Sequence, residues 1–257
     1  MATLSVVLIV KNEAANLAAC LDTVSWADEI VVVDAGSSDN TIEIAQRYTS
    51  KVHVESDWPG YGIQRQRAQC YATGDWILML DADERVTPEL RASIEQVVAS
   101  DDRKAVYAVP RLSWCFGRFI RHGGWYPDRV VRLYPREHAS YGEERVHEKL
   151  HFGSLEERRI SGDLLHFTYR DLHHYLVKSA GYARDWSMQR HARNKKASLL
   201  EGAWHGLGCF LRMYLLRAGF LDGRAGLLLA LLSAHSTFVK YADLWLRDQP
   251  SAPDNAS

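Results

Sequence analysis

The chain has 257 residues, of which 47% are hydrophobic and 25% are charged, and its formal net charge is −1. This composition is that of a globular chain, long enough for one large domain or a domain with an appendage. Because the charge is near neutral, there is no general attraction to nucleic acid, which is excluded as a default partner. Four widely spaced cysteines, no CxxC pair and an N-terminal apolar stretch too short for a signal sequence predict reduced thiols in a cytoplasmic protein.

Short apolar runs alternate with helical segments along the first hundred residues. The pattern predicts strands at 4–10, 29–36, 51–56 and 75–80, and helices over 12–25, 41–50, 63–73 and 87–100. This order predicts an open, mostly parallel α/β sheet with right-handed crossovers. Ligands bind at the carboxyl ends of such strands, where Asn12, Asp34 and Asp81 are expected.

The stretch ILMLDADERV, residues 77–86, places acidic residues directly after an apolar strand. In a turn leaving a strand, Asp81 and Asp83 can converge on one point, and two converging carboxylates repel unless a cation lies between them. A hard divalent ion fits such oxygen ligands. A solvated acidic turn that caps the helix over 87–100 is the alternative interpretation.

Four segments in order resemble the nucleotide-sugar-binding segments of family 2 inverting glycosyltransferases, which have the GT-A fold. They are SVVLIVKNEAANL, EIVVVDAGSSDNT, GYGIQRQRA and GDWILMLDADE. The similarity continues through RVVRLYPR, RVHEKL, LLHFTY and GFLDGRAGLLLA, towards the lipopolysaccharide core β-1,4-glucosyltransferase branch, and it covers residues 3–246. It implies a Rossmann-like sheet with flanking helices, followed by a C-terminal helical appendage.

The resemblance also implies roles for single residues. Asp34 matches the carboxylate that accepts a hydrogen bond from the base of a UDP-type donor, and a helix cap is its alternative. Asn12 and Glu13 match the loop that lines the nucleoside pocket, and Gln64 and Arg65 match the polar stretch beside it. All four could equally be surface groups.

The metal site implied by the resemblance is an Asp-x-Asp motif. Asp81 and Asp83 match it, with Mg²⁺ or Mn²⁺ bridging to the diphosphate and offsetting charge on the leaving UDP. His166 is a candidate to complete the metal shell, or a hydrogen-bonded core histidine. Arg129 and Arg132 could bind phosphate or acceptor oxygens, or form the solvated face of a strand.

An inverting mechanism requires a base that accepts the proton of the acceptor hydroxyl. Candidates lie in YGEERVHEKL, and Glu148 is preferred because Val146 and Leu150 flank it and could partly desolvate it. Glu143 and Glu144 follow a Tyr-Gly turn and are expected to be solvated. A salt bridge to a neighbouring basic residue is the alternative role of Glu148.

The same segment contains HEKLH at 147–151, a literal H-E-x-x-H. On a helix this motif would place two histidines on one face for zinc, with Glu148 as the base of a metallohydrolase. Alternating polar and apolar residues instead favour a strand. A strand or turn at 147–151 would rule out the zinc site.

From residue 171 the sequence becomes helical, aromatic and basic. Between Arg184 and Arg224 there are eight Lys or Arg and three acidic residues, a local net charge of +5. The apolar run AGLLLALLSA is ten residues, which is too few to span a bilayer. The segment is expected to lie on an anionic membrane surface, or else to pack on the catalytic domain or in a dimer.

Together these features predict a metal-dependent inverting glycosyltransferase that moves a hexose, with glucose the preferred prediction, from a UDP-sugar to a lipid-linked saccharide such as lipopolysaccharide inner core. A cytoplasmic protein, peripheral on the inner face of the cell membrane, is expected. A zinc hydrolase and a non-catalytic binding module are the alternatives, and the oligomeric state stays open. The expected divisions are a nucleotide-sugar-binding half (1–105), an acceptor-binding half (106–170), a helical region (171–248) and a disordered tail (249–257).

Overall fold

The computed structural model describes residues 1–142 and 149–249, which divide into two compact units. The first unit contains Met1–Leu112 and Pro127–Phe167. The second contains Ser113–Tyr126 and the chain from Thr168 onward, so a short excursion from the sheet belongs with the helices. Most of the expected tail lies outside the described residues.

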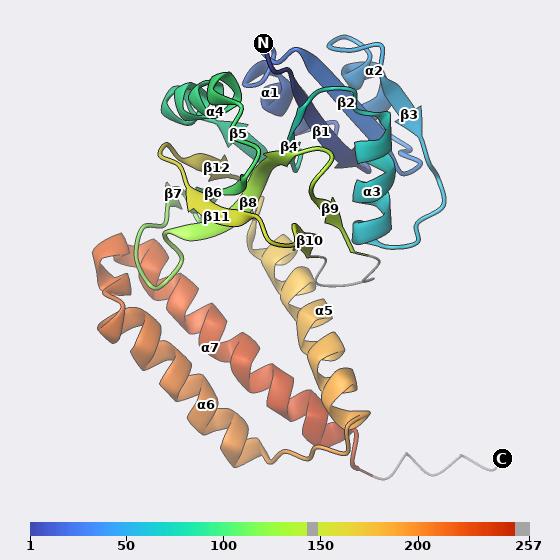
Figure 1. Cartoon of the computed structure of the whole chain (residues 1–257). Helices are drawn as coiled ribbons and strands as arrows, with labels where there is room; N and C mark the ends of the chain where they lie inside the picture. Colours follow the sequence, from blue (N-terminus) through green and yellow to red (C-terminus); the bar gives the residue numbers. More distant parts are fainter. Residues whose placement is uncertain (143–148, 250–257) are drawn as a thin grey trace, which may run out of the picture. The chain divides into compact units, whose positions relative to one another are not determined.

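The first unit is an α/β structure (Figure 1). Its elements in chain order are β1 (Leu4–Val10), α1 (Leu17–Asp22), β2 (Glu29–Asp34), α2 (Thr41–Ala45), β3 (Val52–Val54), α3 (Tyr61–Tyr71), β4 (Trp76–Leu80), β5 (Glu84–Val86), α4 (Pro88–Ser100), β6 (Ala105–Cys115, whose last three residues fall in the second unit), β8 (Asp128–Pro135), β9 (Ser140–Tyr141), β10 (Leu150–His151), β11 (Glu156–Arg159) and β12 (Leu164–His166).

Most of the strands form one large mixed sheet, and β9 and β10 pair with each other in a separate two-stranded sheet. The order of the large sheet is β3-β2-β1-β4-β8-β6-β12-β5, and β11 also pairs with β6. Strands β3, β2, β1 and β4 are parallel, whereas β8 runs antiparallel to both β4 and β6. The GT-A fold expected from the sequence is confirmed, with an antiparallel half added to the parallel one.

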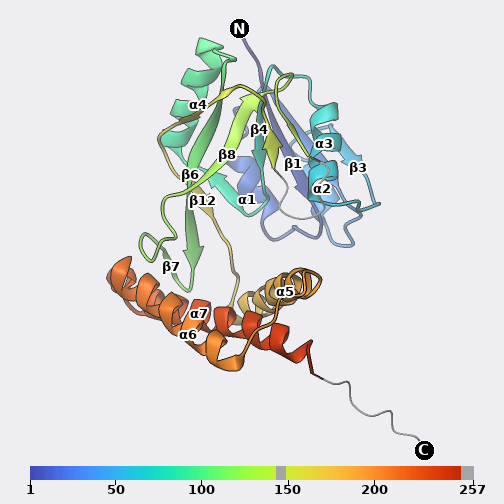
Figure 2. The ribbon, with the colours of Figure 1, turned by 60° about the horizontal axis from the view of Figure 1, so that its bottom comes forward.

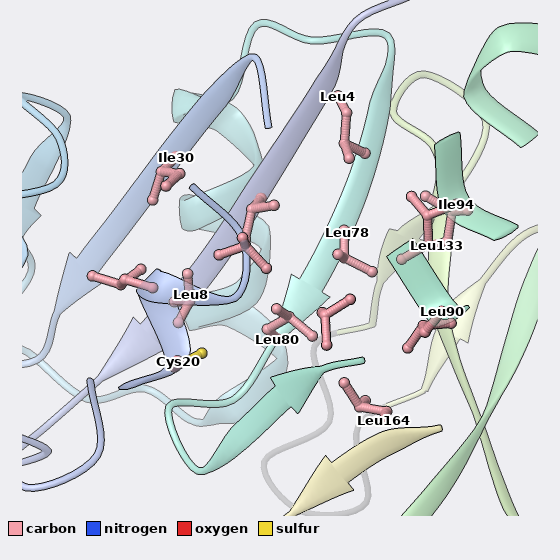
Figure 3. Packing of buried hydrophobic residues seen from close by; sticks show 14 of the residues in the cluster. Leu4, Leu8, Cys20, Ile30, Leu78, Leu80, Leu90, Ile94, Leu133 and Leu164 are labelled. Atoms are coloured by element: carbon pink, nitrogen blue, oxygen red, sulfur yellow. The ribbon is translucent and has the colours of Figure 1, made fainter. Parts of the chain in front are cut away.

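Both faces of the central parallel strands β1, β2 and β4 are buried, which explains why these strands are mostly apolar. Side chains at alternate positions of β1, such as Leu4 and Leu8, pack with α1 and α4 on one face (Figure 3). The intervening Val7 and Ile9 pack with α3 and Tyr134 on the other face. Layers on both faces therefore hold the strand ends in fixed positions.

The helices of the first unit are shorter than the sequence pattern predicts at two places. The helix expected over 12–25 is α1, with six residues, and the helix expected over 41–50 is α2, with five. Asn12 adopts a positive φ of 55°, which is incompatible with a helix start at that position. Side chains of the following loop hold residues 12–14 instead, as described below.

The second unit is mainly helical. Its elements are β7 (Arg118–Phe119), α5 (Leu172–His191), α6 (Leu199–Leu211), the π-helical turn η1 (Arg212–Leu216), the 3₁₀ turn η2 (Gly219–Asp222) and α7 (Gly223–Leu246). Figures 1 and 2 both show α6 and α7 side by side. A small cluster including Cys115, Ile120, Tyr175 and Leu229 forms its core.

Buried Asp222 connects the strand excursion to the helices within this unit. Its Oδ2 accepts hydrogen bonds from the backbone N–H of Arg121 at 3.1 Å and of His122 at 2.7 Å, and Arg118 Nη2 lies 3.5 Å from its Oδ1. The short β6–β7 hairpin is therefore fixed to the start of α7.

Helix α7 differs from the sequence-based expectation. The apolar run is part of one helical stretch, Gly219–Leu246, that is long and apolar enough to cross a membrane by length and composition alone. The expectation that the segment is too short was wrong because it counted only the unbroken apolar run. Helix α7 continues through Ser, His and Thr without a breaker, and length and composition alone are weak evidence for a membrane span.

Candidate active site at the strand ends

The carboxyl ends of β1, β2 and β4 meet at one edge of the sheet. Val10 pairs with Asp34, and Leu8 pairs with Leu80, so the residues that follow each strand leave the sheet together. The structure thus brings the loops that carry Asn12, Asp34 and Asp81 to one edge, as the sequence predicts.

The first two loops are tied to each other. The N–H of Asn12 donates to Ser37 Oγ at 2.8 Å, and Asn12 Oδ1 accepts from the N–H of Ser38 at 2.8 Å. The N–H of Glu13 donates to Thr41 Oγ1 at 2.8 Å, while the Glu13 carboxylate accepts from Asn16 Nδ2 at 2.9 Å. Asn12 and Glu13 thereby shape the loop edge beside β2.

Asp34 ends β2 and is buried, and its carboxylate holds the turn that follows. Oδ1 accepts from the N–H of Gly36 at 2.8 Å and of Ser37 at 2.7 Å, and Oδ2 accepts from Ser37 Oγ. Asp34 does not cap helix α2, whose N-cap is Asn40. An ionised carboxylate offers about four acceptor sites, so Asp34 keeps capacity for one further donor.

Gln64 and Arg65 lie on α3, where both are buried. Gln64 Nε2 donates to the carbonyl of Glu55 at 3.1 Å, which fixes the loop after β3. Arg65 extends to the DADE turn and donates to Asp81 Oδ1 at 2.7 Å, and its guanidinium lies 5.2 Å from the ring centroid of Tyr141. Arg65 thus contacts the acidic turn directly, whereas Gln64 holds the neighbouring loop.

Asp81 is held between two arginines. Besides Arg65, Arg132 of β8 donates from Nη2 to Asp81 Oδ2 at 2.5 Å. Burial opposes ionisation of Asp81, but Arg132 and Arg65 outweigh it and hold the pKa of this carboxyl well below its usual range. The first carboxylate of the motif is therefore ionised, with guanidinium groups offsetting its charge.

Glu84 is the site residue whose role the sequence analysis missed. Its side chain is fully buried, accepts from Arg132 Nη2 at 2.6 Å, and its Oε2 accepts from the N–H of Asp81 at 3.0 Å. Burial opposes the charge of Arg132, but Asp81 and Glu84 hold the pKa of its guanidinium well above its usual range. Arg132 is therefore not on a solvated strand face. It links two acidic residues of the turn.

The alternative role of the acidic turn, as a helix cap, does not match the structure. Helix α4 is capped by Thr87, whose Oγ1 accepts from the N–H of Leu90 at 3.3 Å, and Pro88 occupies its first turn. Asp81 and Asp83 instead precede β5, and neither residue caps α4.

Asp83 lies beside the third candidate ligand, His166. The distance from Asp83 Oδ2 to His166 Nε2 is 3.3 Å, and the N–H of Phe167 donates to the Asp83 carbonyl at 2.9 Å. The antiparallel pairing of β5 with β12 produces this contact across 83 residues of chain, because it sets His166 opposite Glu84. The structure thus places His166, the candidate third ligand, beside Asp83.

This pair fits a small divalent ion. Ligand atoms at about 2.1 Å from Mg²⁺ in octahedral geometry lie about 3 Å from their neighbours, close to the separation of Asp83 Oδ2 and His166 Nε2. Within residues 1–142 and 149–249, no group of three or more His, Cys, Asp or Glu converges on one point. An ion held here would draw its remaining ligands from elsewhere, and substrate phosphate oxygens and water are suited to that.

A cavity of about 440 Å³ opens beside Asp81 in the first unit. It is lined by four basic side chains, one acidic side chain and an aromatic and apolar wall: Arg65, Arg111, Arg132, Lys149, Asp81, Tyr141, Val130, Val131, Leu150 and Phe152. Arg65 and Arg132 are paired with Asp81 and Glu84, and Arg111 with Asp128 at 2.6 Å, so much of the positive charge is offset. The excess of cations suits a phosphoryl or carboxylate group of a substrate.

The zinc alternative is not supported by the part of HEKLH that the structure describes. Leu150 and His151 form β10, which pairs antiparallel with β9, so His151 is not on a helix. A zinc site of this type requires both histidines on one helical face. His147, and the candidate bases Glu143, Glu144 and Glu148, lie outside the described residues.

Comparison with known proteins places the chain in a family. Residues 5–186 match the family model for glycosyl transferase family 2. An uncharacterized glycosyltransferase of Rickettsia prowazekii is 27% identical over 269 residues, covering 97% of this chain and 90% of that protein. The lipopolysaccharide core biosynthesis glycosyltransferase LpsC of Rhizobium meliloti is 26% identical, covering 99% and 97%.

Similar solved structures include glucosyl-3-phosphoglycerate synthase of Mycobacterium tuberculosis in complex with Mn²⁺ and UDP-glucose. It aligns over 67% of this chain and 73% of its own, with 18% identity and a TM-score of 0.46. A structure of S. aureus TarS, residues 1–349, aligns over 95% and 89%, with 12% identity and a TM-score of 0.46.

Proposed function

Because the chain belongs to glycosyl transferase family 2, we propose that it transfers a hexose, glucose by preference, from a UDP-sugar to a hydroxyl group of a lipid-linked saccharide, with inversion at the anomeric carbon. One observation carries this proposal. The strand ends gather the buried carboxylate of Asp34 and the Asp83–His166 pair at one edge of the sheet.

The acceptor class rests on the relatives. A relative that covers nearly the whole chain is named as a lipopolysaccharide core biosynthesis glycosyltransferase. We therefore propose the inner core of lipopolysaccharide as the acceptor. The basic cavity beside Asp81 supports an anionic substrate, since Arg111 and Lys149 line it together with the two arginines that hold Asp81.

We assign a proposed role to each residue of the site. Asp34 accepts the ring N–H of uracil with its remaining lone pair. Asp83 and His166 hold Mg²⁺ or Mn²⁺, while Asp81, whose two oxygens accept from Arg65 and Arg132, holds these arginines at the edge of the ion site. The ion, when bound, supplies Lewis acidity to the departing UDP.

The transfer itself needs a base on the acceptor side. The acceptor oxygen forms a bond to the anomeric carbon as the bond from that carbon to the UDP oxygen breaks, and the hydroxyl proton passes to the base. We propose Glu148 for this role, on the sequence reasoning given above. Glu148→Gln is then expected to retain UDP binding and lose turnover.

A donor screen tests the proposed function. Release of nucleoside diphosphate is measured with a panel of UDP- and GDP-sugars and an acceptor fraction of lipopolysaccharide core, in Mn²⁺, in Mg²⁺ and in EDTA. We expect UDP-glucose to be the best donor and turnover to require the divalent ion. Full turnover in EDTA would overturn the ion assignment, and a preference for GDP-sugars would overturn the donor assignment.

A further inference from the structure

Helix α6 directs its small residues towards α7 and its bulky apolar residues outward. Gly202 and Gly206 are buried, and a Cβ atom at Gly202 would lie 2.9 Å from Tyr241 Cβ, and one at Gly206 would lie 3.0 Å from the Ala234 carbonyl. The two backbones therefore approach closely through a small-xxx-small pattern, as helices do in membranes.

The outward face of α6 is an apolar stripe. It consists of Leu200, Trp204, Leu207, Leu211 and Leu215, spaced three or four residues apart, so that they share one side of the helix and its π-helical extension. Leu200 is 68% exposed and Trp204 is 65% exposed. A soluble protein rarely leaves so continuous an apolar surface in water.

Further exposed apolar residues follow the stripe in sequence, before α7 begins. Leu216 is 82% exposed, and Phe220 and Leu221 are also exposed. We call the α6 stripe together with Leu216, Phe220 and Leu221 the apolar ridge. Arg212, Arg217 and Arg224 lie in sequence among or directly beside these residues.

The basic residues indicate which partner covers the apolar ridge, a lipid surface or a second copy of the chain. The loop before α6 exposes Arg193, Lys195 and Lys196. Three further arginines follow α6: Arg212 in η1, Arg217 in the turn, and Arg224 at the start of α7. Of the two acidic residues between 193 and 224, Asp222 is buried and accepts hydrogen bonds from the backbone of residues 121 and 122. A symmetric dimer through the ridge would bring like charges together, whereas anionic headgroups would neutralise them.

We propose that the apolar ridge docks on an anionic lipid bilayer, with α6 lying in the interface plane, its leucines and Trp204 in the acyl boundary and the flanking Arg and Lys at the headgroups. Tryptophan is enriched at this depth of a membrane. The contact would keep the chain at the surface where a lipid-linked acceptor is found. It goes beyond the proposed transfer reaction and does not depend on it.

Vesicle flotation of the full-length protein tests the ridge. Vesicles of phosphatidylcholine alone are compared with vesicles that also contain phosphatidylglycerol, at low and high salt. We expect binding to the anionic vesicles that weakens as salt rises. The double substitution Leu200→Ser with Trp204→Ser should lower the partition coefficient at least about tenfold, since each buried CH₂ contributes about 0.8 kcal/mol.

Matched variants separate the apolar contribution to vesicle binding from the electrostatic one. Val54→Ser removes an exposed apolar side chain of the first unit and should leave vesicle binding unchanged. Lys195→Gln with Lys196→Gln should weaken binding to anionic vesicles only. Circular dichroism melting and UDP binding of each variant confirm an intact fold, and because vesicle binding is measured without turnover, its outcome is independent of the donor and acceptor assignments.

Three results would overturn the proposal. They are no flotation with anionic vesicles, equal flotation of the Leu200→Ser with Trp204→Ser variant, and a dimer in sedimentation equilibrium that this variant abolishes while vesicle binding is absent. The last result would assign the ridge to a second copy of the chain.

Discussion

Arg132 is the residue on which the acidic turn depends. One guanidinium nitrogen bonds both Asp81 and buried Glu84, and Glu84 in turn accepts the N–H of Asp81. Without Arg132, Arg65 would remain on Asp81 and Arg111 Nη1 would remain 3.6 Å from Glu84 Oε1. Buried Glu84 would still lose the cation that bonds it at 2.6 Å, which is costly. The position of the Asp-x-Asp motif therefore rests on a strand that follows it by about fifty residues.

We predict that Arg132→Met lowers the free energy of unfolding by about 3 to 5 kcal/mol, the range measured when one member of a buried ion pair is removed. Arg129→Met, on the same strand but exposed, should change it by less than about 0.5 kcal/mol. Urea denaturation followed by circular dichroism measures both. Equal effects at the two positions would show that Glu84 and Asp81 do not need this arginine.

Residue roles could be predicted only in part from the sequence. Asp34 lies near the end of one predicted strand, and Asp81 and Asp83 follow another, so their place at the sheet edge could be predicted. The contact of Asp83 with His166 rests on β5 pairing with β12, and the burial of Glu84 on the turn geometry, and neither is encoded in a local pattern. For the same reason Arg132 could equally have been a solvated residue of its strand.

At the scale of elements, the buried strands were the most predictable part of the chain. The strand expected over residues 4–10 is β1 without change, because a run buried on both faces leaves an unbroken apolar signal. The helical segments over 12–25 and 41–50 shortened to six and five residues. Their loops are held by side-chain contacts such as Asn12 with Ser38, which periodicity does not reveal.

The α6–α7 pair gives a prediction at this scale. We expect Gly202→Leu to lower the stability of the helical unit by about 1 to 3 kcal/mol, since its side chain would overlap Tyr241 and Phe238. Gly208→Leu is the matched control, because a Cβ there meets no atom within 4 Å, and it should hold or raise stability through helix propensity. Thermal unfolding measures both, and an equal loss in the two variants would contradict close packing at Gly202.

The near-neutral net charge of the whole molecule conceals two different charged surfaces. The first unit has a basic cavity beside its acidic turn, and the second has a basic segment around an apolar ridge. One part of the division into two units could not be predicted from the sequence. Residues Ser113–Tyr126 leave the sheet and belong with the helices. That assignment depends on Asp222, about a hundred residues further along the chain.

If the strand ends hold a divalent ion for a uridine diphosphate, the chain binds Mn²⁺ in the presence of UDP. Free Mn²⁺ is followed by electron paramagnetic resonance as protein is added in the presence of UDP. The chain should bind Mn²⁺, and Asp83→Asn and His166→Gln should each weaken binding by about tenfold or more, the cost of one lost charged or coordinating contact. The exposed control Asp185→Asn should bind as the unaltered chain does. Unchanged Mn²⁺ binding in both Asp83→Asn and His166→Gln would contradict the account.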